Sequence, residues 1–236
     1  MRKIMTTVFF LILVSLSSLA LASEAPSQRT ITVTGDSIVT CAPDMATVEL
    51  RIITSAKTSQ EAQKENARLA KDVRNYLDTL GIEPSNIDST QFSLSPQYQE
   101  EKNRPSTIVG YTLRHILTVT ISDLTKLSAV IDGAMQYGTT QIGPIIYERH
   151  DKEAFKAEAL TKAARVAEQK AIVLATAFGE PKPKLLNISE TGVHYRPHTV
   201  LYKANAMRDT TTAISTELSP EDIEVTASVT AVFTLP

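Results

Sequence analysis

Apolar and polar residues alternate along seven segments of the chain, which is the pattern of β-strands that bury one face. The clearest segment covers residues 46–52, where Val48, Leu50 and Ile52 share one face. The other six strands are expected at residues 31–35, 87–98, 108–121, 141–148, 185–193 and 223–235. Short polar connections between several of these segments favour antiparallel pairing.

Three further segments have the spacing of amphipathic helices instead. The first follows Thr58-Ser59-Gln60-Glu61, which has the spacing of a capping box, and it is expected to end at Gly81. The second begins after Asp123 and ends at Gly138. The third, from about Asp151 to Phe178, is rich in alanine, whose small side chain favours helix and permits close approach to a sheet.

The order β-β-α-β-β-α-β-α-β-β predicts an α+β fold with mostly antiparallel sheets and three helices. Residues Ile108 to Phe178 read strand–helix–strand–helix, which resembles a ferredoxin-like β-α-β-α segment. We expect a single domain over residues 23–236. An alternative subdivision joins residues 23–107 with 181–236 and separates residues 108–180.

The first 22 residues have the organisation of a secretory signal peptide. Arg2 and Lys3 are basic, an apolar run covers residues 8–16, and Ala20-Leu21-Ala22 forms a cleavage sequence. The apolar run is too short for a comfortable membrane anchor. We therefore expect cleavage after Ala22, export, and a periplasmic location in a Gram-negative cell. No integral membrane span is expected after cleavage, while peripheral association with the envelope stays open.

Composition excludes several classes of protein. The formal net charge is −2 and no block of basic residues is present, which argues against nucleic acid as a partner. The chain has one Cys and no Trp, so a disulfide-stapled or CxxC metal-dependent fold is excluded. Cys41 is therefore an unpaired thiol, and without His or Lys beside it we expect it to be buried and structural. An intermolecular disulfide and a reactive thiol are the alternatives.

The four histidines provide no specific catalytic or metal-binding pattern. His194 and His198 are four residues apart, but Pro197 lies between them in an expected loop. His115 follows Arg114 in a strand, where we expect a position at the surface or at the edge of the core and not a catalytic role. Dispersed Ser–His–Asp triads are not excluded, but the chain has no G-x-S-x-G sequence and no Gly-rich phosphate loop. We expect no catalytic, cofactor-binding or metal-binding residues, and no enzyme.

Residues Tyr195 to Pro220 form a long polar segment that is expected to be a loop, and a loop of this length is usually functional or disordered. Tyr, Met and Arg are common at interface cores. The candidate contacts for a homo-oligomer are Tyr195, His198, Tyr202, Met207 and Arg208. Strands near Ile31 and Val229 are expected at sheet edges, where pairing between subunits would satisfy free backbone groups.

Several short motifs resemble, in order and spacing, the SIMPL-domain family of bacterial periplasmic proteins, which includes the YggE-like and periplasmic immunogenic protein group. The motifs are Ile31-Thr32-Val33-Thr34-Gly35, Gly110-Tyr111-Thr112-Leu113, Asp123-Leu124-Thr125-Lys126-Leu127, Ala159-Leu160 through Lys170-Ala171, Ile188-Ser189-Glu190 and Ile223-Glu224-Val225. The chain departs from the family pattern at Gly35-Asp36-Ser37 and Gly138-Thr139-Thr140.

The resemblance implies a protein that assembles into ring- or channel-like oligomers and that is linked to oxidative-stress tolerance. The motifs are mostly packing and turn positions, so the resemblance brings no catalytic residues. The favoured interpretation is a non-enzymatic periplasmic protein whose partner is a second copy of itself. The alternative is a small-ligand binder or an enzyme whose site is built from scattered polar residues.

Overall fold

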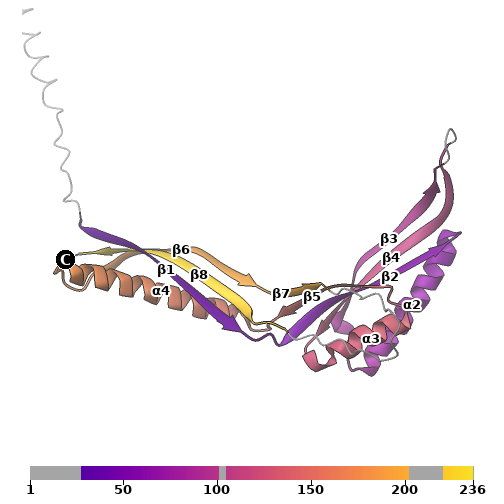
Figure 1. Cartoon of the computed structure of the whole chain (residues 1–236), viewed down its shortest axis with the longest axis horizontal. Coiled ribbons are helices and arrows are strands. Elements are labelled where there is room, and N and C mark those ends of the chain that lie inside the picture. Colours follow the sequence, from indigo (N-terminus) through magenta and orange to yellow (C-terminus); the bar gives the residue numbers. More distant parts are fainter. Residues whose placement is uncertain (1–27, 101–104, 202–219, 236) are drawn as a thin grey trace, which may run out of the picture.

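The computed structural model describes residues 28–100, 105–201 and 220–235, and it has the predicted α+β fold. Its described part forms two lobes that lie end to end in an elongated molecule (Figure 1). The predicted signal peptide, residues 1–22, lies outside the described residues. Both sheets are antiparallel, as the short connections between the predicted strands indicated.

The first lobe contains a sheet in the order β3-β4-β2-β5-β7. Its strands are β2 (Met45–Ala56), β3 (Ile87–Gln99), β4 (Thr107–Ile121), β5 (Gln141–Glu148) and β7 (His198–Leu201). Two helices pack on the sheet, α2 (Ser59–Thr79) and α3 (Leu127–Tyr137), and short 3-10 turns precede β3 and α3 at Pro84–Asn86 and Leu124–Lys126. The predicted capping box is present, with Thr58 and Glu61 bonding each other's backbone N–H.

The first lobe is a complete ferredoxin-like unit, which corrects the extent predicted from the sequence. The chain runs β2-α2-β3-β4-α3-β5, and the order β3-β4-β2-β5 is that of a split βαβ arrangement. The unit covers residues 45–148 and not residues 108–178. The prediction failed at the last helix because that helix packs on the other lobe. We call residues 45–148 with β7 the ferredoxin-like lobe.

The second lobe, here called the terminal lobe, is a sheet in the order β1-β8-β6 with one long helix on it. Its elements are β1 (Thr30–Cys41), α4 (Lys152–Ala177), β6 (Lys184–Arg196) and β8 (Ile223–Thr234). The buried face of α4 is made of alanines at every fourth position, Ala159, Ala163, Ala167, Ala171 and Ala175. Because these side chains are small, the helix lies very close to β1. At Gly35 of β1 the helix leaves no space for a Cβ atom.

The two sheets divide the chain differently from the subdivision considered above. Strand β4 lies after residue 107 but pairs with β2 and β3, while α4 packs on β1 and β8. The expected loop at residues 195–220 also starts with strand, because β6 continues to Arg196 and β7 follows at once. Residues 202–219 of that loop lie outside the described residues.

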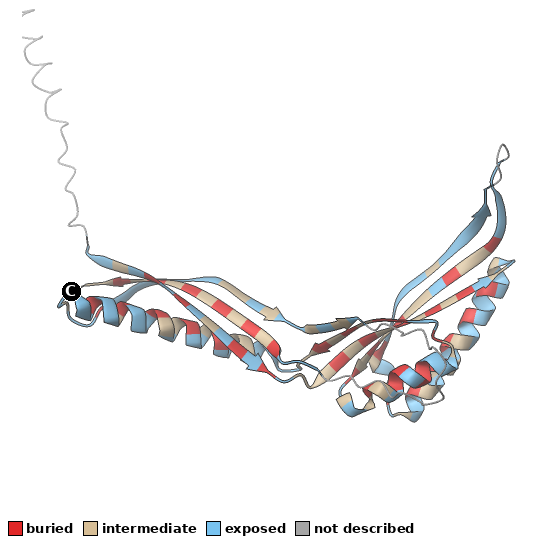
Figure 2. Cartoon of the chain, viewed as in Figure 1, coloured by how far each residue is buried: buried red, intermediate tan, exposed pale blue. Residues whose placement is uncertain are grey.

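Each lobe has its own hydrophobic core, and Figure 2 shows the buried positions in two separate groups. The core of the ferredoxin-like lobe lies between its sheet and α2 and α3, and includes Leu50, Val73, Leu117 and Ile131. The core of the terminal lobe lies between α4 and the inner residues of β8, such as Val225 and Phe233. The lobes are therefore separate packing units joined by a narrow junction.

Arg149 lies at this junction and contacts residues on both sides. Its Nε is 2.7 Å from Asp151 Oδ1, and its Nη1 donates to the Ala42 carbonyl at 2.9 Å. The guanidinium carbon lies 4.8 Å from the centre of the Phe155 ring on α4, and Nη2 is 3.6 Å from Asp44 Oδ2. The side chain thus links the β1–β2 connection to the start of α4.

Candidate functional site

The described candidates for oligomer contact, Tyr195 and His198, make their contacts within the chain at the junction. The Tyr195 hydroxyl accepts from the Arg149 backbone N–H at 2.9 Å, and burial raises the pKa of Tyr195. The His198 ring centre is 5.9 Å from that of Tyr147 on β5. Tyr202, Met207 and Arg208 lie outside the described residues. Two of the five thus flank the connection between β6 and β7, where each contacts a different residue of the chain.

Cys41 is the last residue of β1 and is buried in the core of the terminal lobe, with 6% of its surface exposed. The structure gives it no disulfide partner among the described residues. Burial raises the pKa of the Cys41 thiol, and the nearby Arg149 only partly opposes this shift. A thiol in these surroundings is protonated at neutral pH and is a poor nucleophile.

Of the two strands predicted to lie at sheet edges, one does and one does not. Strand β1, which carries Ile31, lies at one edge of its sheet. Strand β8, which carries Val229, is the central strand, because Val229 pairs with Gly35 on one side and Glu190 on the other. The second edge is β6. Alternation along β8 showed one buried face but could not show how many neighbours the strand has.

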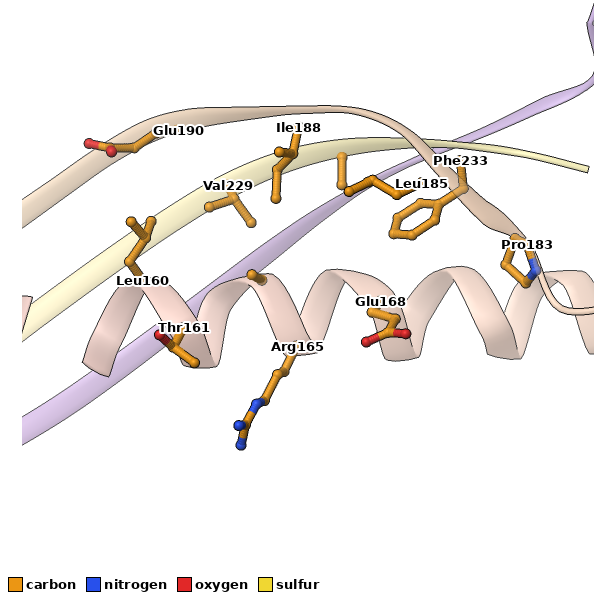
Figure 3. Close-up of a pocket in the computed structure, with 12 residues that line it drawn as sticks. Leu160, Thr161, Arg165, Glu168, Pro183, Leu185, Ile188, Glu190, Val229 and Phe233 are labelled. Atoms are coloured by element: carbon orange, nitrogen blue, oxygen red, sulfur yellow. The ribbon is translucent and has the colours of Figure 1, made fainter. Parts of the chain in front are cut away.

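An apolar groove of about 610 Å³ runs between α4 and β6 (Figure 3). It exists because α4 packs closely on β1 and β8 but only lightly on β6. In Figure 3 the side chains of Leu185, Ile188 and Phe233 point from the sheet toward the helix. Leu185 and Ile188 are 55% and 45% exposed. We define the β6 groove by its apolar lining, Leu160, Ala164, Pro183, Leu185, Ile188, Val229, Ala231 and Phe233.

The opposite flank of α4, toward β1, has a second apolar surface of a different shape. Val173 and Leu174 are exposed there, Val173 by 66%. Together with Val33 and Val166 they line a shallow hollow between α4 and β1. We call Val173 and Leu174 the α4 ridge. Contiguous apolar surface of this kind marks interaction sites on soluble proteins.

A polar cluster in the ferredoxin-like lobe joins three residues that the sequence did not bring together. His115 Nε2 is 2.7 Å from Ser89 Oγ on β3, and His115 Nδ1 is 3.0 Å from Asn66 Oδ1 on α2. Asn66 is fully buried, and its Nδ2 donates to the Ile52 carbonyl at 3.1 Å and lies 3.4 Å from Thr54 Oγ1. Ser89 is exposed.

This geometry fixes the tautomer of His115. Asn66 must direct Nδ2 at the Ile52 carbonyl, so its Oδ1 accepts from His115 Nδ1–H. His115 Nε2 is then the unprotonated nitrogen, and the Ser89 hydroxyl donates to it. Burial first, and Arg74 second, lower the pKa of His115, so the ring is neutral at pH 7. The available sequence signal was a His between two apolar residues on the buried face of a strand.

The described residues contain neither a cluster that could hold a metal ion nor a helix that could span a membrane. Within residues 28–100, 105–201 and 220–235, no three His, Cys, Asp or Glu side chains are grouped to hold a metal ion. His194 and His198, the pair considered for a metal, are on different strands, β6 and β7. Of the helices in those same ranges, none has the length and apolar character needed to cross a membrane.

The chain is an α+β protein with two lobes, one of which is ferredoxin-like. Comparison with known proteins shows the family to which it belongs. The chain matches the SIMPL family, described as a protein of unknown function (DUF541), over residues 31–233. It belongs to this family, as the order of its short motifs predicted.

Relatives with curated sequences include a 26 kDa periplasmic immunogenic protein of Brucella melitensis, 30% identical over 164 residues. That match covers 68% of this chain and 66% of the relative, which is just under two thirds of the relative's length. The uncharacterized protein YggE of Edwardsiella ictaluri is 26% identical over 197 residues, covering 83% of this chain and 82% of the relative. YggE of Escherichia coli K12 is 25% identical over 178 residues, covering 75% and 72%. None of these names indicates an enzyme family.

Proposed function

We propose that the chain is an exported periplasmic protein that assembles with copies of itself into a closed ring or channel-like oligomer. The observation that carries this proposal is the pair of different apolar surfaces, the β6 groove and the α4 ridge, on opposite flanks of one helix. We further propose that this assembly serves oxidative-stress tolerance, as the family resemblance implies.

The difference between the two surfaces favours a head-to-tail contact. The β6 groove is a hollow lined by apolar side chains, and Val173 on the α4 ridge is 66% exposed, so the groove of one copy can receive Val173 of the next. A contact between two different surfaces repeats from copy to copy, and it closes into a ring when the rotation allows. Burial of exposed apolar surface is the main driving force of such association.

Side-chain packing is favoured over strand pairing as the contact. Strand β6 has register shifts between Leu185 and Asn187 and between Glu190 and Gly192. Bulges of this kind twist an edge strand and hinder the addition of another strand. The shift at Leu185 and Asn187 interrupts the alternation of β6, so that Leu185 and Ile188, three residues apart, both face the groove.

Two observations support the periplasmic location. Residues 1–22 have the organisation of a signal peptide, and a relative is named a periplasmic protein. N-terminal sequencing of the exported protein should begin at Ser23. Recovery of the uncleaved chain in a membrane pellet would contradict cleavage and export in this form.

Light scattering on the chain that begins at Ser23 tests the assembly. Wild type should have the mass of an oligomer, and both Ile188→Lys in the groove and Val173→Lys in the ridge should lower it to that of a monomer. Ser189→Lys is the matched control, since Ser189 is the exposed neighbour of Ile188 on the other face of β6. It should leave the mass unchanged.

Mixing the two variants tests the head-to-tail arrangement itself. The Ile188→Lys copy keeps an intact ridge and the Val173→Lys copy keeps an intact groove, so one contact forms and the product is a heterodimer. Two monomers in the mixture would overturn the groove-to-ridge contact, and a monomeric wild type would overturn the assembly.

A further inference from the structure

We propose that Ser89, His115 and Asn66 form a nucleophile, base and positioning group, and that Ser89 takes acyl groups from esters with short apolar acyl chains. This activity goes beyond the proposed assembly and does not rest on it. It corresponds to the alternative that the sequence left open, an enzyme whose site is built from scattered polar residues.

The three side chains have the geometry that activation of a serine requires. A nucleophile within 2.6–3.2 Å of a base that is oriented by a third group is the pattern of nucleophilic catalysis. Here the two distances are 2.7 Å from Ser89 Oγ to His115 Nε2 and 3.0 Å from His115 Nδ1 to Asn66 Oδ1. The amide holds the ring in the tautomer that can accept the hydroxyl proton, as the Asn does in Cys-His-Asn proteases.

Ser89 is also placed where a substrate can reach it. It is exposed on the edge strand β3, beside a bulge between Ser89 and Gln91. The register pairs Ser89 with Leu117, so its side chain lies on the helix-covered face of the sheet, at the margin of the core. An exposed serine beside a half-buried, oriented histidine is the arrangement expected of an activated nucleophile.

Apolar side chains beside Ser89 indicate the class of substrate. Phe92 lies edge-on to His115, with 5.3 Å between ring centres, and 58% of its surface is exposed. Leu94 is 43% exposed and lies on the same face, because Phe92 and Leu94 pair with His115 and Leu113 of β4. A short apolar acyl group can rest on this surface while its carbonyl carbon meets Ser89.

The charges around His115 suit this chemistry. Arg74 on α2 is the charged group that acts on the ring, and its Nη1 lies 3.4 Å from the Ile87 carbonyl, two residues before Ser89. The other neighbours of the ring, on β2, β3 and α2, are the uncharged Ile52, Phe92 and Asn66. Burial, with Arg74 second, lowers the pKa of His115 and keeps the imidazole neutral. We propose that Arg74 also favours the negative charge that develops on the ester oxygen.

The reaction balances with water as the only co-reactant. Ser89 Oγ forms a bond to the ester carbonyl carbon while its proton passes to His115 Nε2. The bond from that carbon to the leaving oxygen breaks, and the alcohol leaves with the proton from Nε2. Water then attacks the acyl-serine with its proton passing to Nε2, and release of the carboxylic acid returns that proton to Ser89.

Intact-mass analysis with a fluorophosphonate probe tests the nucleophile in the whole exported chain. Ser89 Oγ attacks the phosphorus of the probe and fluoride leaves. Wild type should therefore gain one phosphonyl group, which peptide analysis should map to Ser89. Ser89→Ala, an exposed substitution that leaves the core intact, should gain none. Ser93→Ala on the same strand is the control and should react like wild type. An unlabelled wild type, or equal labelling of Ser89→Ala, would overturn the proposal.

The pH profile separates an activated serine from an ordinary one. Labelling requires neutral His115, whose pKa is lowered from the ordinary value of about 6.5. The rate should therefore rise through a pH below about 6.5 and stay level from pH 7 to 9. A rate that keeps rising with hydroxide to pH 9 would contradict a role for His115. His115→Gln, with its fold checked by circular dichroism, should lower the rate at least tenfold.

Discussion

Cys41 illustrates at the scale of one residue how burial decides reactivity. Its side chain belongs to the core of the terminal lobe, and burial raises the pKa of the thiol. The thiolate is the reactive form, so a raised pKa and restricted access both slow attack on a reagent. We expect a thiol reagent to modify native protein far more slowly than protein in urea.

The measurement is the release of chromophore from a disulfide reagent with and without denaturant. Cys41→Ser provides the background, since the chain has a single Cys. Stoichiometric modification of native protein within seconds would show an accessible thiolate and would favour a redox role over a structural one.

His115 shows what a residue pattern can and cannot predict about a site. Its place between Leu113 and Leu117 on a buried strand face is visible in the sequence, and it indicates a polar group that needs partners. Its partners are on β3 and α2, and neither is identified by spacing. The β6 groove could not be predicted from the sequence either, because it arises from how far α4 extends over its sheet.

At the scale of elements, local signals predicted nearly every helix and strand. The strand at residues 141–148 and the capping box at Thr58 were predicted in place, because each depends on neighbouring residues alone. Strand β7 was missed because its four residues, HTVL, are too few for a clear alternation. The order of strands in the sheets could not be predicted, since it depends on contacts between distant segments.

The packing of α4 on its sheet gives a prediction at Gly35. A Cβ on this residue would lie 2.0 Å from the Ala163 carbonyl oxygen and 2.7 Å from the Ala167 backbone nitrogen. Gly35→Ala must push the helix away from β1, and overpacking of this kind lowers the free energy of unfolding by about 1–3 kcal/mol. Urea denaturation measures the change.

Gly192→Ala on β6 is the matched control. The nearest atom to its added Cβ is His194 Nε2 at 3.1 Å, the end of a side chain that can rotate. Its unfolding midpoint should stay close to that of wild type. A Gly35→Ala variant as stable as this control would show that the helix tolerates displacement from the sheet.

At the scale of the whole molecule, two separate cores raise the question of whether the lobes unfold together. Arg149 links the β1–β2 connection to α4, and its ion pair with Asp151 lowers the pKa of that carboxyl. We expect Arg149→Gln to weaken the coupling between the lobes. Differential scanning calorimetry should then show a broader transition, with a higher ratio of calorimetric to van't Hoff enthalpy than wild type.

Arg68→Gln is the control for the loss of an arginine, because Arg68 pairs with Glu65 and Asp72 on the surface of α2 within one lobe. Its enthalpy ratio should equal that of wild type. The lowered pKa of Asp151 gives the same junction a pH dependence. The contribution of the Arg149–Asp151 ion pair to the coupling of the lobes is fully present above the ordinary pKa of Asp, about 3.9. It is lost as the pH falls through the lower pKa that Asp151 has in the folded protein. An unchanged ratio in Arg149→Gln would show that the backbone connections alone couple the lobes.

The pairing of β1 with β8 also determines when the terminal lobe can be completed. Thr30 pairs with Thr234, and the whole ferredoxin-like unit lies between them in the chain. Closing so long a loop costs entropy and slows folding, while residues 45–148 can fold from contacts of shorter range. Val229 and Phe233 of β8 line the groove beside β6. A chain that is still being made, or that is truncated before β8, therefore lacks the groove, and only finished copies present it to one another.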